Sequence, residues 1–409
     1  MTRKRLHLFD GFGIELEYMI VDRRTLSVRP IGDHLLRTPS GKVESEIPMG
    51  DLKRSNELVL HVLELKTNGP APSLNGLQQS FQRGVCQMNG MLESLEAVLM
   101  PTAMHPWMNP LRETRLWPHA YGEVYKAFDR IFGCRGHGWS NLQSMHVNLP
   151  FFDDSEFERL HAAVRPILPL VPAIAASSPI VEGRLTGLMD NRIEFYRHNQ
   201  EKIPSLSGNI VPEPLYSKKA YQNQLLKKLY QDVAPYDADG VLRYEWINSR
   251  GAIARFERNT IEIRLIDMQE CPLADLAVAA AVVGLVRLLM NETWVPLERL
   301  KRFPTDSLFH LLSESVRSAD CARIVDADFL ALFGIKAPVT ALDLWRRILD
   351  SGRFDTLGES FHAPLQIILR DGPLARRIVR ALGKSVSPAL LKDIYGRLVN
   401  CLQTGTLFE

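Results

Sequence analysis

The sequence predicts an α+β fold built on a mostly antiparallel sheet, with helices filling the last third of the chain. Apolar and polar residues alternate with a period of two at residues 12–21, and again on both arms of residues 253–267, where Arg258 and Asn259 lie between the arms. Such alternation is typical of strands that bury one face, and two short runs joined by a tight turn form an antiparallel hairpin. After Pro272 the apolar residues instead recur every three or four positions, which indicates helices.

Two further strands and two helices are expected in the first half of the chain. Residues 57–67 are rich in aliphatic residues and end at an Asn-Gly-Pro turn, so they should form a strand. Residues 78–99 carry apolar side chains at helical spacing, and Pro101 then closes that helix. Another helix is expected around residues 121–132, followed by a strand at residues 143–149.

The middle of the chain is less regular. Residues 154–176 should form two helical stretches interrupted by prolines, and the polar stretch 183–214, with its glycines and prolines, should be a functional loop. The apolar run 276–286 is too short to span a bilayer and predicts a buried helix. Because we find no internal repeat and no flexible linker, we expect a catalytic region at residues 1–275 and a helical region at residues 276–409 packed on the same domain.

The composition excludes several classes of protein. The 409 residues are 45% hydrophobic and 23% charged, which is ordinary for a globular chain. Forty-nine Lys and Arg against forty-seven Asp and Glu leave a net charge of +2, too balanced to indicate a nucleic-acid or membrane binder. The five cysteines are widely spaced without a CxxC pair, and no apolar signal segment follows the N-terminus, so we expect a cytoplasmic protein.

Carboxylates interrupt strands that should be buried. Glu15 and Glu17 lie two residues apart on one strand, so their side chains point to the same face roughly 6.5 to 7 Å apart and repel unless a cation bridges them. Such a pair is by itself most often the wet face of a strand. Glu64 and Glu262, however, each lie among aliphatic residues on other strands. Carboxylates buried together favour a hard cation such as Mg²⁺, which also accepts phosphate oxygens.

A histidine and an arginine extend this pattern. His146 lies in a strand and is a possible nitrogen ligand, although a lone strand histidine is more often a core residue. Arg264 lies two residues after Glu262, where it forms either an ordinary ion pair or a contact with transferred phosphate. No Walker A motif occurs in the sequence, so neither a P-loop NTPase nor a Rossmann enzyme is supported.

Five segments, in order along the chain, resemble the glutamate–cysteine ligase type 2 family of carboxylate–amine ligases, which is related in fold to glutamine synthetase. These segments are FGIELEYMIVD, ELVLHVLELKTN, SMHVNLP, SSPIVEGRLTGLMDNR and RNTIEIRLIDMQECP, and they span about residues 11–275. The resemblance implies an antiparallel sheet that forms an open, funnel-like site, with helices packed on its outer face. It also implies that glutamates hold ATP and Mg²⁺ there.

The resemblance assigns roles within the site. Arg264 corresponds to the arginine that contacts the transferred phosphate, and is the expected catalytic residue. The expected metal ligands are Glu15, Glu17, Glu57, Glu64, His146 and Glu262. The expected substrate-binding residues are Asn148, Ser178, Thr186 and Arg192. Asn148 stands where some relatives carry a second histidine, which brings the chain closer to the glutamate–cysteine ligases.

The implied activity is that of an ATP-dependent carbon–nitrogen ligase. The γ-phosphate of ATP activates a carboxylate, taken to be the γ-carboxylate of glutamate, as an acyl phosphate, and the amine of cysteine or of another small molecule attacks it to form an amide. Three alternatives remain open at this point: a ligase with a peptide-linked acceptor, a catalytically silent homologue that binds nucleotide or amino acid, and a dinuclear metallohydrolase. The last would need more histidine or aspartate ligands. No oligomeric state follows from the sequence.

Overall fold

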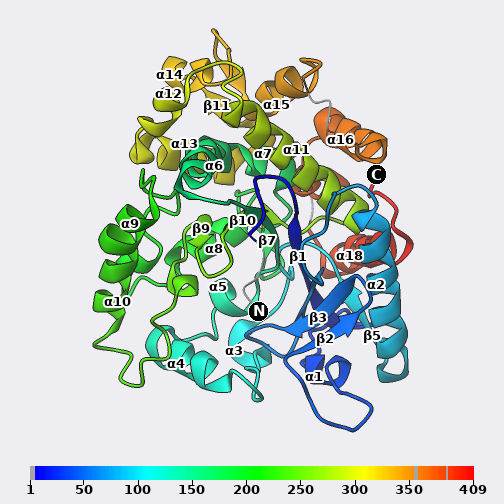
Figure 1. Ribbon diagram of the computed structural model, residues 1–409. Coiled ribbons are helices and arrows are strands. Elements are labelled where there is room, and N and C mark those ends of the chain that lie inside the picture. Colours follow the sequence, from blue (N-terminus) through cyan, green and yellow to red (C-terminus); the bar gives the residue numbers. More distant parts are fainter. Residues whose placement is uncertain (1–4, 354–357, 384–385) are drawn as a thin grey trace.

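The computed structural model describes residues 5–353, 358–383 and 386–409, and its elements are arranged around an open antiparallel sheet (Figure 1). The strand order is β2-β3-β4-β1-β6-β10-β9, so β1 is central. Along one edge of β1, residues 13–16 pair with β6 and residues 19–22 pair with β5. The strands are β1 (Gly13–Asp22), β2 (Glu46–Met49), β3 (Leu52–Asn56), β4 (Val62–Thr67), β5 (Ala97–Met100), β6 (Ser144–Pro150), β9 (Ala252–Arg255) and β10 (Thr260–Asp267).

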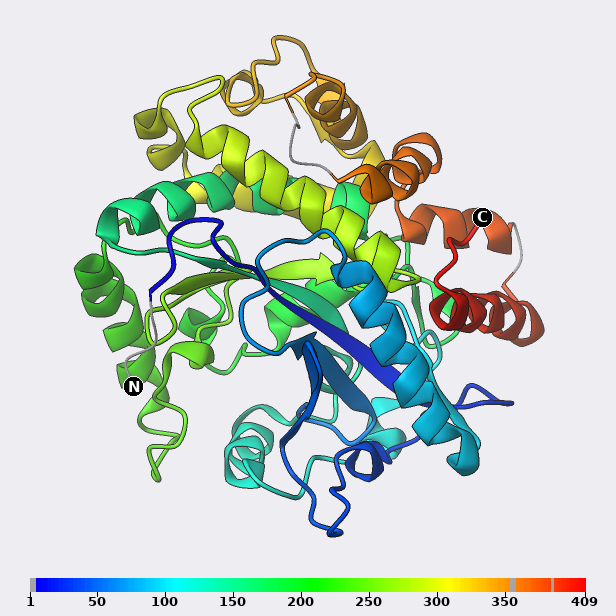
Figure 2. The ribbon, with the colours of Figure 1, turned by 45° about the vertical axis from the view of Figure 1, so that its right-hand side comes forward.

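The two faces of the sheet differ in polarity because side chains alternate along each strand. On β1, the side chains of Ile14, Leu16 and Tyr18 are buried in the hydrophobic core, whereas Glu15 and Glu17 project from the other face. The apolar face is covered by three helices, the longest of which, α11, contacts the other two and crosses the molecule above the sheet in Figure 2. These helices are α2 (Leu77–Leu92), α6 (Asp154–Ile167) and α11 (Pro272–Met290).

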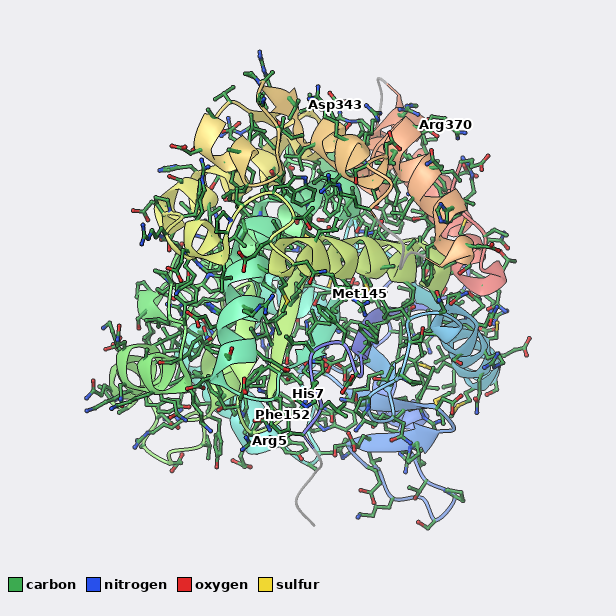
Figure 3. All side chains as sticks on the ribbon, turned by 45° about the horizontal axis from the view of Figure 1, so that its top comes forward. Arg5, His7, Met145, Phe152, Asp343 and Arg370 are labelled. Atoms are coloured by element: carbon green, nitrogen blue, oxygen red, sulfur yellow. The ribbon has the colours of Figure 1, made fainter. Side chains whose placement is uncertain are left out.

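The helix α11 lies at the centre of the core. It is long and apolar enough, by length and composition, to cross a membrane. All of its residues except Leu273 and Arg287 are buried inside the protein, however, as expected for a core helix that is apolar on every side. Met145, on β6 and labelled in Figure 3, is fully buried in the same hydrophobic core. The buried helix predicted at residues 276–286 is therefore confirmed, although it extends further in both directions.

The last third of the chain is otherwise mainly helical. The prediction of helices alone is wrong at one place, because β11 (Arg323–Ile324) and β12 (Val339–Thr340) form a small ribbon. The helix α16 packs against α11, and α18 packs against α2 and β5. The helices of this part are α12 (Leu297–Lys301), α13 (Thr305–Ser318), α14 (Ala327–Ala331), α15 (Ala341–Leu349), α16 (Glu359–Asp371), α17 (Leu374–Leu382) and α18 (Pro388–Thr404).

The polar face of the sheet is walled by α4 (Gly122–Phe132), α5 (His137–Ser140) and α8 (Asn191–His198). The stretch 183–214, expected to be a loop, thus contains a helix. Asp190 begins that helix, because its side chain accepts a hydrogen bond from the backbone N–H of Ile193. The remaining short elements are α1 (Gly32–Leu35), α3 (Pro110–Glu113), α7 (Pro172–Ala175), β7 (Ile180–Val181), β8 (Arg184–Leu185), α9 (Lys218–Ala220) and α10 (Lys227–Val233).

Two expected elements are shorter than the sequence indicates. The helix expected at residues 78–99 stops at Leu92, and after one further turn Glu96 takes a positive φ of 51° before β5 begins. The apolar run of β5 gains the backbone hydrogen bonds of β1 there. The strand expected at residues 57–67 begins only at Val62. Glu57 therefore follows β3 rather than opening β4.

Candidate active site

The polar face of the sheet forms the floor of a cavity of about 740 Å³. Strands that are far apart in the sequence contribute charged side chains to this floor, as expected. Antiparallel register explains the meeting, because directly opposed residues point to the same face with Cβ atoms about 4.5–5.5 Å apart. The opposed pairs are Glu17 with Glu64, Glu15 with His146, and Glu262 with Asn148.

Side chains on β6 hold the two glutamates of β1 in place. His146 Nδ1 lies 3.0 Å from Glu15 Oε2, and His146 Nε2 lies 2.9 Å from Ser144 Oγ. The backbone N–H of Ser144 donates to Glu17 Oε2 at 2.7 Å. Burial opposes protonation of His146, yet its hydrogen bond with Glu15 and the charge of Glu17 raise its pKa above the ordinary value. The imidazole thus partly offsets the charge of the two carboxylates.

Three potential metal ligands from β1, β4 and β6 lie close together on this floor. Glu15, Glu64 and His146 each offer a ligand atom within 4.8 Å of the others. Burial and the charge of Glu15 raise the pKa of Glu64 to about 7, although Lys66 Nζ lies 2.5 Å from Glu64 Oε2 and Ser55 Oγ donates to the same oxygen at 2.7 Å. Burial and the charge of Glu15 together therefore outweigh the opposing effect of Lys66 on this pKa.

Glu57 faces the same cluster from the segment after β3. It is half-buried and lines the cavity, and burial together with the charges of Glu17 and Glu64 raises its pKa well above the ordinary value. Crowded oxygen donors of one sign fit a hard divalent cation, which would relieve the repulsion. The residues on this floor therefore fit Mg²⁺ in donor type and in charge.

Glu262 lies between two arginines on the other side of the floor. Its Oε1 forms an ion pair with Arg264, whose Nε lies 2.8 Å away, and its Oε2 accepts a hydrogen bond from Arg255 Nη1 at 3.2 Å. Arg264 Nη1 also lies within 3.4 Å of the hydroxyl of Tyr196. Glu262 is only 2% exposed, so it fixes both guanidinium groups at the edge of the carboxylate cluster. Such a pair can bind an anion next to a metal site.

The structure separates the four residues that were expected to bind substrate. Arg192 lines the cavity, whereas Asn148 supports the floor by donating to Glu15 Oε1 at 3.1 Å. Ser178 is buried beneath the cavity, and Thr186 is exposed outside it. Thr186 contacts its own loop, where its hydroxyl accepts from the backbone N–H of Leu188 at 3.1 Å.

Several lining residues were not anticipated. Lys66 and Arg255 bring positive charge into the site. Lys66 lies two residues after Glu64 on β4, and Arg255 lies on β9, the hairpin partner of β10. Their positions beside predicted site residues were the signal in the sequence that could have identified them. A wall of aromatic residues faces the same cavity, and in it the rings of Tyr244 and Trp246 stack with centroids 5.8 Å apart. A flat apolar wall beside a charged floor suits a ligand with both a planar ring and anionic groups. The other aromatic residues of the wall are Tyr121, Tyr125, Phe128, Trp139 and Tyr196.

Comparisons with known sequences agree with this geometry. The family model described as glutamate-cysteine ligase family 2 (GCS2) matches residues 11–394. An uncharacterised protein of Archaeoglobus fulgidus is 34% identical over 306 residues, which are 75% of this chain and 79% of that protein. A Bradyrhizobium protein named "Putative glutamate--cysteine ligase 2" is 28% identical over 278 residues, and the match spans 66% of this chain but only 59% of that relative's length.

A solved structure shares the fold. The glutamate–cysteine ligase of Francisella tularensis, crystallised in complex with AMP, superposes with a TM-score of 0.63 and covers 98% of this chain and 90% of its own. The sequence identity is 13%, so this likeness concerns the fold alone. It confirms the predicted α+β class with an open antiparallel sheet.

Proposed function

This chain belongs to glutamate–cysteine ligase family 2, as its five motifs predicted, and on that premise we propose that it is an ATP-dependent ligase that joins a carboxylate to an amine through an acyl phosphate. One observation carries the proposal. Carboxylates from β1, β4 and β10 converge with a histidine and two arginines on the floor of one cavity. A site that must bring an anionic carboxylate against an anionic polyphosphate needs this combination of cation ligands and fixed positive charge.

The carboxylate cluster is the proposed metal site. The ligands would be Glu15, Glu17, Glu64 and Glu262 through oxygen and His146 through nitrogen, with Glu57 at the rim. Bound Mg²⁺ would neutralise phosphate oxygens and act as a Lewis acid on the transferred phosphoryl group. Ser144 and Asn148 keep Glu17 and Glu15 in position by donating hydrogen bonds to them.

The arginines are proposed to act in the first step, in which a carboxylate oxygen attacks the γ-phosphorus and ADP leaves. Arg264 is anchored through Nε to Glu262, so its terminal nitrogens are left to contact the equatorial oxygens of the phosphoryl group. Arg255, held by the same carboxylate, adds a second positive charge. Because both side chains are fixed before substrate binds, little reorganisation is needed when negative charge develops.

In the second step the amine attacks the acyl carbon, and phosphate leaves as the amide forms. The acyl phosphate must be protected from water during this step. The aromatic wall that includes Trp139 and Trp246 closes one side of the cavity with apolar surface. We therefore assign to this wall the exclusion of water and the contact with a planar ligand group.

The proposed substrates are glutamate, through its γ-carboxylate, and cysteine or another small amine. Family membership supports this choice. Arg192 offers one local feature, because its Nη2 is buried at the cavity and has no hydrogen-bond partner among the residues that the structure describes. It is therefore available to an anionic group of the substrate.

Turnover with a panel of substrates tests the proposal. Purified protein with Mg-ATP and glutamate should release phosphate and form a γ-glutamyl amide, detected by mass spectrometry, only when a suitable amine is present. Failure with every small amine but turnover with a peptide would move the acceptor to the peptide-linked class. Tight ATP binding that is independent of Mg²⁺, with no turnover, would identify a catalytically silent homologue instead.

A further inference from the structure

A β-bulge interrupts β10 at Arg264 and Leu265. Ile263 lies opposite Val147, but Ile266 lies opposite Met145, so Arg264 and Leu265 together face the single residue His146. A bulge leaves one residue unpaired and re-aims a side chain. Without the bulge, strict alternation would place each residue after Arg264 on the other face of the strand.

Asp267, at the end of β10, gathers hydrogen bonds just beyond the bulge. Its side chain is fully buried, and its Oδ2 accepts from the backbone N–H of Ser177 at 2.8 Å and from Ser178 Oγ at 3.1 Å. Its Oδ1 accepts from Arg192 Nε. Asp267 lies opposite Ser144 in the sheet, so it sits on the same face as the carboxylate floor, beneath the start of α8.

Arg192 links Asp267 to the bulge. While its Nε is held by Asp267, its Nη1 donates to the backbone carbonyl of Arg264 at 3.3 Å. The backbone N–H of Arg192 donates to Ser178 Oγ at 3.1 Å, and Ser178 Oγ in turn donates to Asp267. Both the backbone and the side chain of Arg192 are therefore connected to Asp267. The backbone carbonyl of Arg264 thereby has a hydrogen-bond donor.

The other edge of the bulge is also constrained. The backbone N–H of Arg264 donates to the carbonyl of Gly251 at 2.8 Å. A Cβ atom on Gly251 would lie 2.4 Å from the side chain of Leu265, so only glycine allows this approach. The backbone of Arg264 is thus held from both sides, by Arg192 and by Gly251.

We propose that Asp267 is a positioning residue, which acts through Arg192 to hold the bulge so that the Arg264 guanidinium points into the cavity beside Glu262. The role of Arg264 in turnover rests on the proposed function, whereas the structural link from Asp267 to the bulge does not. Nothing in this arrangement requires Asp267 to touch a substrate, because it lies under Arg192 and is fully buried.

A double-mutant cycle tests the link. Asp267→Asn keeps the shape of the side chain but removes its charge, and should lower kcat at least tenfold while KM for ATP changes less than threefold. In an Arg264→Lys background, the same substitution should change kcat less than threefold, because the group that Asp267 positions is already altered. Losses that simply multiply would overturn the proposal, since Asp267 would then act independently of Arg264.

A control and a second readout separate positioning from general damage. Asp320→Asn breaks another Asp–Arg pair, with Arg376 at 2.9 Å, away from the cavity, and should leave kcat unchanged. Hydrogen exchange should become faster at the amides of residues 264–266 in Asp267→Asn but not in Asp320→Asn. Unchanged protection at those amides would contradict the proposal, whatever the kinetics show.

Folding of the variant is favoured by Asp190. Burial raises the pKa of Asp190 well above its ordinary value and the charge of Asp267 adds to this effect, so loss of the Asp267 charge removes one cause of the raised pKa and favours a negative charge on Asp190 near Arg192. If Asp267→Asn is nevertheless insoluble, Arg192→Lys takes its place in the hydrogen-exchange measurement, because a single amine cannot bond both Asp267 and the Arg264 carbonyl. The same results support or overturn the link. A parent protein that makes no amide would refute the proposed function, while hydrogen exchange would still decide the positioning role.

Discussion

Replacing Glu262 by glutamine is the sharpest perturbation of the proposed site. The glutamine keeps the size and one acceptor oxygen of the side chain, but removes the negative charge that lies 2.8 Å from Arg264 and 3.2 Å from Arg255. It also removes one proposed metal ligand. Glu262→Gln should therefore abolish Mg²⁺-dependent phosphate release while the fold stays intact.

The expected magnitudes follow from the contacts of Glu262. Breaking a buried ion pair by removing one partner costs about 3–5 kcal/mol, and the low end applies here because Arg255 keeps an ion pair with Glu257. At about 2.1 cal/mol/K of unfolding entropy per residue, 3 kcal/mol lowers the Tm of a chain of 409 residues by about 3–4 °C. Loss of a preorganised electrostatic group lowers turnover about 10²- to 10³-fold.

The assay measures phosphate release against Mg²⁺ concentration for three proteins. Glu298→Gln is the matched control, because Glu298 lies exposed on α12 and pairs only with Lys301 among the described residues. This control should match the parent protein at every Mg²⁺ concentration. A Glu262→Gln variant that turns over at the parental rate in saturating Mg²⁺ would remove Glu262 from the mechanism.

Three further substitutions test the packing that supports the site. Burial raises the pKa of Asp275 well above its ordinary value of 3.8, so as pH rises this carboxyl ionises in the unfolded chain before it does so in the folded protein, and the folded protein loses stability. Asp275→Asn removes this loss and should be more stable than the parent at pH 7 in urea unfolding. Burial lowers the pKa of His161 from 6.5 to about 3, so below pH 6.5 this residue makes the free energy of unfolding decrease by about 1.4 kcal/mol for each unit that the pH falls. His161→Phe should remove this contribution from the pH dependence measured by urea unfolding, and an unchanged pH dependence would refute the reasoning. Gly251→Ala should cost about 1–3 kcal/mol because the new methyl group meets Leu265, whereas a variant as stable as the parent would argue against the tight bulge.

The sequence predicted the strands that alternate and missed those that do not. The strands β1, β6 and β10 show one polar and one apolar face, and all three lie within a residue or two of the expected ranges. The strand β9 was predicted with β10 as the other arm of the hairpin. The pair β2 and β3 carries no such alternation: Pro48 interrupts one strand, and Arg54 on the other is buried because its Nε donates to the carbonyl of Leu35. A hydrogen bond to a distant carbonyl leaves no periodic trace in the sequence.

The sequence could predict which charged residues of each strand belong to the candidate site, but not which residues of other strands they contact. Carboxylates within apolar strands marked Glu15, Glu64 and Glu262, because burying them requires a partner. Register across the sheet decides which cations meet them, so Arg255 appeared only with the structure. Thr186 shares a motif with Arg192, yet a turn directs it into solvent.

In the proposed site, the carboxylates of Glu15, Glu64 and Glu262 bind divalent cations that also coordinate the terminal phosphate of a nucleotide. A crystal of the protein with Mn²⁺ and a non-hydrolysable ATP analogue tests this arrangement most directly, because Mn²⁺ binds oxygen ligands as Mg²⁺ does and gives an anomalous signal. Anomalous peaks should lie within coordination distance of Glu15, Glu64 and Glu262, each also touching phosphate oxygen. Well-ordered nucleotide with no peak between these three carboxylates would contradict it.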